Sequence, residues 1–361
     1  MDVSRRRFLA AFLGVIVALT ACSGGGGSGG GGGEDATEGA LTNGERLVSF
    51  RGAGGLNLAG TLGVPEQATG PAPGVLILSS LASNVDHDGF QTATDPDKLY
   101  LDLSKALNAA GMVTLRYDRR GVGASKLESG SKLPTYDQLV GDARGALIYL
   151  AQRREVGSAG VAVLGHDVGG WMAMQLAATD TKVKAVTLLS TPGRPLVDVL
   201  ADGFKATYGA ASADRFRATV AGFLASGKLP GPDAIAPEHQ GVLAQGYGDI
   251  LKGEFSASPV ADAGKVKVPT QVIYGMQATT VTKVDADILA KAIGPTAQVV
   301  PYEGGTNLKP VLPDGKPPVF DPLDESTHVF GARPIVSVDR DAATLAKISS
   351  FLLSSARGAK G

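Results

Sequence analysis

One short stretch of the chain combines an ionisable side chain with the residues that build a sharp turn. An apolar run leads into Gly165-His166-Asp167-Val168-Gly169, and a helix-like stretch follows. The two glycines flank a residue that would adopt a strained, left-handed conformation, which aspartate tolerates comparatively well. An aspartate carboxyl has an unperturbed pKa of about 4, so it is ionised at neutral pH without help from a base. The pattern predicts a strand–turn–helix unit with Asp167 as the candidate nucleophile.

A carboxylate nucleophile would form an ester, and release of that ester needs a base that activates water. The chain has four histidines, His87, His166, His239 and His328. His328 is the first candidate base, because it lies between the last predicted strand and the last predicted helix; the alternative is a histidine in a surface loop. His87 is the second candidate. His166 belongs to the turn itself and is expected to be structural, and His239 is expected to be solvated.

The elements that would position these residues alternate along the chain. Short apolar runs predict strands at 46–51, 56–63, 74–80, 112–117, 161–165, 184–190, 270–275 and 297–303. Longer amphipathic stretches predict helices at 99–110 and 136–153, from the turn to residue 178, and at 339–353. This alternation favours an α/β fold, with a mostly parallel sheet and helices on both of its faces.

The alternation of strands and helices breaks between residues 191 and 268. Residues 195–251 are rich in helix formers and contain no clear strand. We therefore interpret 195–260 as a helical cap over the site. A long packing insertion is the alternative.

Three further sequence motifs lie before and after the turn. Residues 83–89 read SNVDHDG, residues 115–125 read LRYDRRGVGAS, and residues 190–196 read STPGRPL. Together with the turn, which takes the place of a G-x-S-x-G nucleophile elbow, they resemble α/β-hydrolase esterases grouped with serine aminopeptidase-like and dienelactone-hydrolase-like enzymes. The resemblance covers residues 45–356. It implies the α/β-hydrolase fold, with a mostly parallel central sheet, helices on both faces and a helical cap insertion.

The second motif contains the charged run Asp118-Arg119-Arg120-Gly121. It has two interpretations, a charged binding patch or a structural ion pair with a turn. We expect the structural role.

The departures from the family fall on its catalytic triad. Asp167 stands where the family has serine, and Ala278 stands where G-x-x-D would supply the carboxylate that orients the histidine. The segment Glu303 to Lys309 lacks the family's histidine, and Asn307 is taken as its equivalent. The resemblance with a substituted triad implies weak or no ester hydrolysis, and a fold retained as a binding or scaffold module for an unidentified small molecule. Ser80, Leu81 and Val168 would form the oxyanion-hole region.

Two active alternatives remain open. The segment Gly165–Gly170 matches G-H-D-x-G-G, the elbow of haloalkane dehalogenases and epoxide hydrolases, which implies attack by Asp167 on a saturated carbon with His328 as base. Asp285 or Asp287 would then orient His328, although both are more simply placed at the start of an exposed helix. The H-G-x-P oxyanion motif of those enzymes is absent after residues 74–80. The second alternative is residual esterase or peptidase activity through rearranged groups.

The N-terminal residues predict export and anchoring. Residues 1–21 contain Ser4-Arg5-Arg6-Arg7, typical of a twin-arginine signal, followed by a short apolar run. Cys22 follows Leu19-Thr20-Ala21, which resembles a lipobox with a lipidated cysteine. Residues 22–44 would be a lipidated Gly/Ser-rich tether. The expected location is a bacterial cell envelope. Ser23 after Cys22 lacks the aspartate that retains lipoproteins at the inner membrane, so the sequence is compatible with an outer-membrane destination. An uncleaved anchor or a simple secretory signal is the alternative.

Composition limits the other classes of function. The formal net charge is −1, and removal of residues 1–21 would bring it to −3 without leaving a basic run, so no nucleic-acid partner is expected. Cys22 is the single cysteine, which excludes disulfides and thiolate metal sites from the rest of the chain. With four scattered histidines, we expect neither a metal nor another cofactor.

Overall fold

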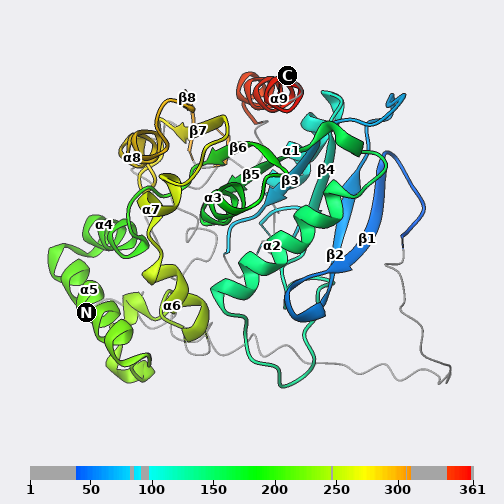
Figure 1. Cartoon of the computed structure of the whole chain (residues 1–361). Helices are drawn as coiled ribbons and strands as arrows, with labels where there is room; N and C mark the ends of the chain where they lie inside the picture. The colour runs from blue at the N-terminus through cyan, green and yellow to red at the C-terminus, as the bar shows by residue number, and fades with distance from the viewer. Residues whose placement is uncertain are drawn as a thin grey trace, which may run out of the picture. The chain divides into compact units, whose positions relative to one another are not determined.

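The computed structural model describes residues 38–81, 85–90, 97–244, 247–305, 307–309 and 340–358. Within these residues, eight strands form one sheet in the order β1-β2-β4-β3-β5-β6-β7-β8 (Figure 1). Their bounds are β1 (Glu45–Arg51), β2 (Asn57–Gly63), β3 (Gly74–Leu78), β4 (Val113–Tyr117), β5 (Val161–His166), β6 (Val183–Leu189), β7 (Thr270–Gly275) and β8 (Ala297–Tyr302). The pairs β1–β2 and β2–β4 are antiparallel, and the other neighbours are parallel. The predicted mostly parallel sheet is confirmed.

Helices lie in the connections between these strands. The α-helices are α1 (Leu99–Ala109), α2 (Tyr136–Ala151), α3 (Gly169–Thr179), α4 (Leu196–Tyr208), α5 (Ala210–Ser226), α6 (Gly248–Ser256), α7 (Pro259–Ala263), α8 (Lys283–Ile293) and α9 (Ala342–Gly358). Short 3-10 turns occur at Ala53–Gly55, Gly157–Ala159, Pro232–Ala234 and Pro237–His239. The predicted α/β architecture is therefore present in the described chain.

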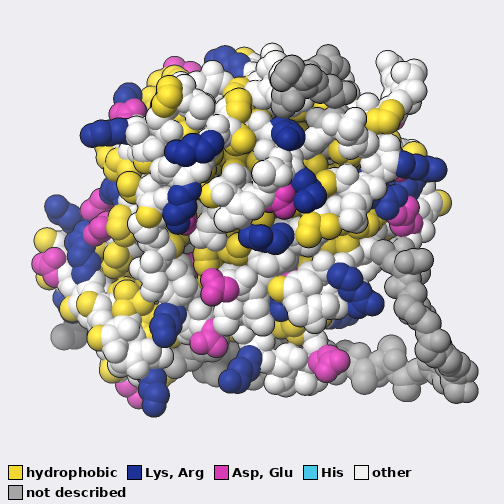
Figure 2. Space-filling view, viewed as in Figure 1, with side chains coloured by type: hydrophobic (Ala, Val, Ile, Leu, Met, Phe, Trp, Pro, Cys, Tyr) yellow, Lys and Arg dark blue, Asp and Glu magenta, His cyan; other side chains and the backbone are white. Residues whose placement is uncertain are grey.

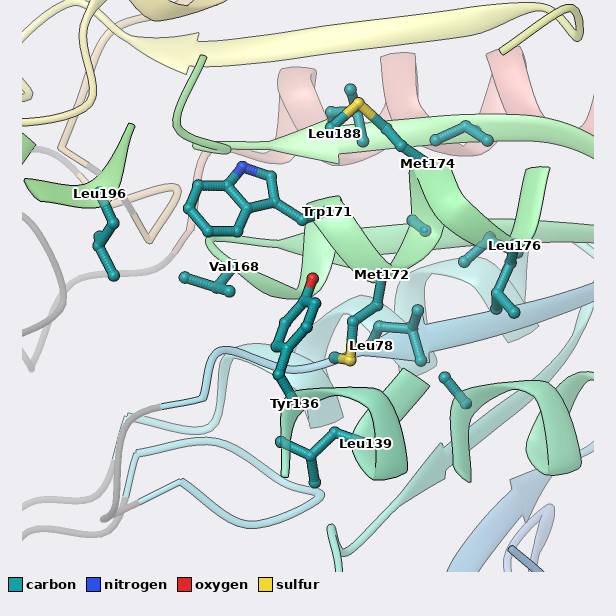
Figure 3. Close-up of a cluster of buried hydrophobic side chains, with 14 of the residues drawn as sticks. Leu78, Tyr136, Leu139, Val168, Trp171, Met172, Met174, Leu176, Leu188 and Leu196 are labelled. Atoms are coloured by element: carbon teal, nitrogen blue, oxygen red, sulfur yellow. The ribbon is translucent and has the colours of Figure 1, made fainter. Parts of the chain in front are cut away.

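Helices cover both faces of the sheet, because successive residues of a buried strand point to opposite sides. Along β3, Leu76 and Leu78 belong to the apolar cluster that includes α2 and α3, whereas Val75 and Ile77 belong to the cluster that includes α1 and α9. Figure 3 shows part of the first cluster, with Met172 of α3 beside Leu78. The site is thus built on a sheet that is packed on both sides.

Several elements begin or end at other residues than the apolar pattern predicts. Strand β3 ends at Leu78, two residues earlier than predicted, and Ser79 and Ser80 form the loop that leads into the site. Helix α2 starts at a capping box, in which Thr135 accepts a hydrogen bond from the Gln138 N–H and Gln138 accepts one from the Thr135 N–H. Helix α9 extends five residues beyond the predicted end at 353.

Four helices, α4 to α7, connect β6 to β7, in the region predicted to be helical. Within it, Phe216 packs against both Phe204 of α4 and Phe255 of α6. His239 is fully buried beside Phe204 and Phe216, and its Nε2 lies 3.0 Å from the Ser212 hydroxyl oxygen. The expectation that His239 is solvated was wrong, because side chains of α4 and α5 pack against its ring.

Several predicted features lie outside the described residues, namely the export signal (1–21), Cys22 with most of the tether (22–44), and His328. In the part of the chain that is described, no helix has the length and apolar character needed to span a membrane. On the face seen in Figure 2, acidic and basic side chains are interspersed.

The charged motif that begins at Asp118 has the structural role expected for it. Arg120 donates two hydrogen bonds to the Asp142 carboxylate on α2, and both side chains are buried. The Asp118 carboxylate accepts hydrogen bonds from the Ala124 N–H and the His87 N–H, and it lies 2.7 Å from Nδ1 of His87. These contacts hold the loop after β4 against β2, α2 and the 85–90 segment.

Replacing Asp142 with alanine should lower the free energy of unfolding by about 3–5 kcal/mol, because Arg120 would remain buried without its counter-ion. The double substitution Arg120→Met and Asp142→Leu should recover most of that loss. Urea unfolding followed by circular dichroism measures both effects. A cost below about 1 kcal/mol for Asp142→Ala would mean that the pair contributes no more than a surface ion pair.

Candidate functional site

Asp167 occupies a tight turn between β5 and α3. Its φ is +55°, in the left-handed region, and its N–H donates to the Leu189 carbonyl of the neighbouring strand. A Cβ at Gly165 would lie 2.5 Å from the Gly169 carbonyl oxygen, and one at Gly169 would lie 2.5 Å from the Leu78 carbonyl oxygen. Both glycines are therefore required by close backbone contacts, and the elbow geometry predicted from the sequence is present.

The Asp167 carboxyl is buried, with 3% of the residue exposed. The Ser80 hydroxyl donates to its Oδ2 at 2.6 Å, whereas Oδ1 is buried without a hydrogen-bond partner among the described atoms. Burial raises the pKa of Asp167 to about 7, and hydrogen bonds from the Ser80 hydroxyl and the Val168 N–H oppose that increase. Near neutral pH this carboxyl is consequently present in both protonation states.

At two of the three residues of the expected oxyanion-hole region, Ser80 and Val168, the donors are already directed to other groups. The Ser80 N–H donates to the Tyr100 hydroxyl, which lies 3.0 Å from Nδ1 of His166. The Val168 N–H and the Ser80 hydroxyl interact with the Asp167 carboxyl itself. In this arrangement the region stabilises a resident carboxylate, at the place where an esterase would stabilise a substrate oxyanion.

Asp167 lies on the wall of a cavity of about 270 Å³. Helices α4 and α6, which belong to the helical region between β6 and β7 that we call the cap, also line this cavity. Small-molecule sites typically range from about 300 to 1,000 Å³, so this cavity suits a small ligand. The lining is mainly apolar and comes from both the sheet edge and the cap. It comprises Ser80, Leu81, Arg119–Val122, Leu133, Pro134, Asp167, Val168, Leu196, Leu200, Gly241, Val242, Ala244, Tyr247, Ile250, Leu251, Glu254 and Phe255.

Glu254 is the second acidic residue of this cavity. It lies on α6 and is 8% exposed. Burial, and then the nearby Asp167 carboxyl, raise the pKa of Glu254 to about 8, while Arg119 lowers it. Sequence reasoning missed Glu254, because no motif surrounds it; the prediction of a cap over the elbow could have indicated only the region.

The other predicted triad positions do not line the cavity. Ala278 is buried in the turn after β7. Asn307 donates to the Asp97 carboxylate at 3.1 Å, and its carbonyl accepts a hydrogen bond from Arg340. Asn307 therefore joins the segment after β8 to the start of α1 and α9.

Of the histidines within the described segments, none lines the cavity. His87 lies 2.7 Å from the Asp118 carboxylate, and its Nε2 lies 3.3 Å from the Thr61 hydroxyl. His166 is buried beside Tyr100 and Phe90, behind the elbow. The first candidate base, His328, lies outside the described residues, so no described histidine is placed to accept a proton beside Asp167.

The expectation that both Asp285 and Asp287 start an exposed helix was wrong for Asp285. Its side chain is fully buried, caps α8, and accepts hydrogen bonds from the Arg194 guanidinium. Asp287 is exposed and forms an ion pair with Lys283. The Arg194–Asp285 pair links the start of the cap to α8, since Arg194 immediately precedes α4.

Replacing Asp167 with asparagine should stabilise the protein at pH 8 and not at pH 4. The folded-state pKa of about 7 lies above the unfolded value, so the cost of ionising the buried carboxyl is absent below about pH 4 and complete above about pH 7. The gain at pH 8 should be on the order of 4 kcal/mol at most. Urea unfolding at both pH values measures it, with the exposed Asp287→Asn as the control. Equal gains at pH 4 and pH 8 would refute the raised pKa.

Comparisons with known proteins agree with this geometry. Residues 95–216, which include the elbow, match the family described as serine aminopeptidase, S33. The chain is 26% identical over 238 residues to the esterase EstD of Thermotoga maritima, a match that covers 65% of this chain and 53% of the relative. The chain thus spans about half the length of this curated relative.

Solved structures show the same fold. An esterase of Pyrococcus furiosus aligns with a TM-score of 0.50 at 14% identity, covering 85% of this chain and 91% of its own. Est1E from Butyrivibrio proteoclasticus aligns with a TM-score of 0.50 at 15% identity, covering 85% and 97%. The alpha/beta hydrolase GrgF from Penicillium sp. sh18 aligns with a TM-score of 0.51 at 18% identity, covering 73% and 91%. These solved structures show that the chain has the α/β-hydrolase fold, and its sequence is similar to the serine aminopeptidase S33 family over residues 95–216 and to an esterase.

Proposed function

We propose that this protein is an envelope-tethered module with an esterase fold, which binds a small, mainly apolar molecule in the cavity over Asp167 and hydrolyses carboxylic esters weakly or not at all. The observation that carries this proposal is the buried Asp167 carboxyl at the nucleophile turn, held by the Ser80 hydroxyl. A serine triad needs a hydroxyl, a histidine that removes its proton, and donors for the oxyanion. Around Asp167 a carboxyl replaces the hydroxyl, no described histidine lines the cavity, and the donors of Ser80 and Val168 are directed to other groups.

The chemistry of a carboxylate supports weak ester hydrolysis. Attack by Asp167 on an ester carbonyl would produce an acyl anhydride, and a carboxylate leaves the tetrahedral intermediate more easily than an alkoxide does. The intermediate would therefore return to the starting ester. The donors that would stabilise its oxyanion have other acceptors: the Ser80 N–H donates to Tyr100, and the Ser80 hydroxyl and the Val168 N–H interact with Asp167.

The cavity supports a binding role. Leu196 and Leu200 of α4 and Leu251 and Phe255 of α6 supply apolar walls opposite the elbow. Polar side chains, among them Asp167 and Glu254, belong to the same lining. An apolar concave site with a few convergent polar groups is typical of small-molecule binding.

The tether belongs to the same proposal and rests on the sequence of residues 1–44. If Cys22 is the lipidated residue, Cys22→Ser should release the protein from the membrane fraction of a producing bacterium, and the matched change Ser23→Ala should not. Fractionation followed by immunoblotting measures this. Retention of the Cys22→Ser protein in membranes would favour the apolar run before Cys22 as an uncleaved anchor.

Ester hydrolysis tests the proposed loss of activity. Purified protein and its Asp167→Ala variant should hydrolyse p-nitrophenyl acetate and butyrate at equal, low rates, because no acyl group passes through Asp167. The exposed Asp287→Ala variant is the control for a change in charge. A decrease of a hundredfold or more in Asp167→Ala alone would overturn the proposal.

A second candidate function is attack by Asp167 on haloalkanes or epoxides, with His328 as base. Asp167 Oδ1 favours it, since this atom has no hydrogen-bond partner in the described structure while Oδ2 is held by Ser80. Intact-protein mass after incubation with these compounds separates the candidates. An adduct that is absent from Asp167→Ala would favour alkylation, and its absence in both proteins would favour binding alone.

A further inference from the structure

Two acidic side chains from different parts of the chain line the same small cavity. Asp167 comes from the turn after β5, and Glu254 comes from α6 of the cap. Both residues are more than nine-tenths buried. Among the described atoms, Oδ1 of Asp167 is buried without a hydrogen-bond partner. Burial and the nearby Asp167 carboxyl disfavour the charged form of Glu254, and the Arg119 charge favours it. A buried polar atom without a donor is costly, so Oδ1 of Asp167 points to a ligand in the cavity.

When both carboxyls are ionised, the basic groups that line the cavity neutralise only one of the two negative charges. Arg120 is paired with Asp142 and is not available to the cavity acids. Arg119 donates to the carbonyls of Leu81 and Val85, and its charge interacts with Glu254. Arg119 therefore offsets one of the two carboxylates, and a ligand with a single positive charge would offset the other.

Among the residues that the structure describes, the other titratable groups around Glu254 do not supply that charge. Tyr136 of α2 faces α6, and burial raises its pKa, so it stays neutral at physiological pH. The same holds for Tyr100 beside Asp167. Tyr247 also lies on the cavity wall. His239 packs behind Phe216 in the cap, and burial lowers its pKa, which keeps it uncharged above its ordinary titration range.

We propose that the cavity binds a small apolar amine, with the protonated amino group between the carboxylates of Asp167 and Glu254 and the hydrocarbon part against Leu200, Val242 and Phe255. This inference rests on the proposed binding function of the cavity and names its ligand class. Charge-assisted hydrogen bonds to two buried carboxylates would replace the water that each acid loses on folding. A carboxylate ligand would be repelled, and a neutral ligand would leave the second charge without compensation.

Binding of an amine should be coupled to the release of protons from the two acids. An alkylammonium has a pKa near that of lysine, about 10.4, so it is charged throughout pH 6–8. Burial raises the pKa of Asp167 to about 7 and that of Glu254 to about 8, so both acids are mostly protonated at pH 6. Because the ammonium ion binds the ionised acids, binding must release protons, and affinity should increase as pH increases from 6 to 8.

The test compares three ligands of matched shape, cyclohexylmethylamine, cyclohexylmethanol and cyclohexanecarboxylate, by isothermal titration calorimetry with the purified protein. The amine should bind at least tenfold more tightly at pH 8 than at pH 6, and more tightly than the alcohol or the acid. Titrations in phosphate and in HEPES, which differ in protonation enthalpy, should reveal proton release. Glu254→Gln should weaken the amine at least tenfold, whereas Asp249→Asn, an exposed acid on the same helix, should have no effect.

The outcomes separate this inference from the proposed function on which it rests. If the alcohol binds as tightly as the amine, or if Glu254→Gln binds the amine normally, the ligand class is wrong and the cavity remains a binding site. If none of the three compounds binds, the binding function and the amine inference both fail. Thermal unfolding of Glu254→Gln at pH 8 confirms that the variant is folded before its affinity is interpreted.

Discussion

The close contact between the elbow and the neighbouring strand is the constraint on which the rest of the site depends. Gly169 brings the start of α3 against the end of β3, where a Cβ would meet the Leu78 carbonyl oxygen. This contact holds Asp167 at positive φ and places its carboxyl beside the Ser80 hydroxyl. In a serine hydrolase the same turn exposes a nucleophile to the substrate. Here it holds an acid against its neighbours.

The cap buries the Asp167 carboxyl, and burial makes its ionisation unfavourable. Helices α4 and α6 cover the elbow with apolar side chains, and their burial disfavours the charged form of Asp167. Glu254 adds a second acid from the same cap, and the Asp167 carboxyl raises the cost of ionising it. The pair places two acids, whose ionisation depends on pH, in an apolar cavity. We find ligand binding a better explanation of this pair than packing.

Structural ion pairs hold the frame around this cavity. Arg120 and Asp142 connect the loop after β4 to α2, and Arg194 and Asp285 connect the start of the cap to α8. Arg194 belongs to the segment that resembles a family motif, and its guanidinium contacts a carboxylate 91 positions along the chain. These residues hold the loops around the cavity in place, and none of them belongs to the predicted triad positions Asp167, Ala278 and Asn307.

The amino-acid sequence determined the strands and the elbow, because apolar periodicity and glycine spacing act over a few neighbouring residues. It indicated a helical region after β6 for the same reason. The assignment of Ala278 and Asn307 as triad positions stays a prediction. Only the tertiary structure decided that Glu254 lies in one cavity with Asp167, that His239 is buried, and that Asp285 pairs with Arg194. It also decided that the Ser80 N–H donates to Tyr100. These contacts join residues far apart in the chain, and their partners are selected by packing, which no local pattern records.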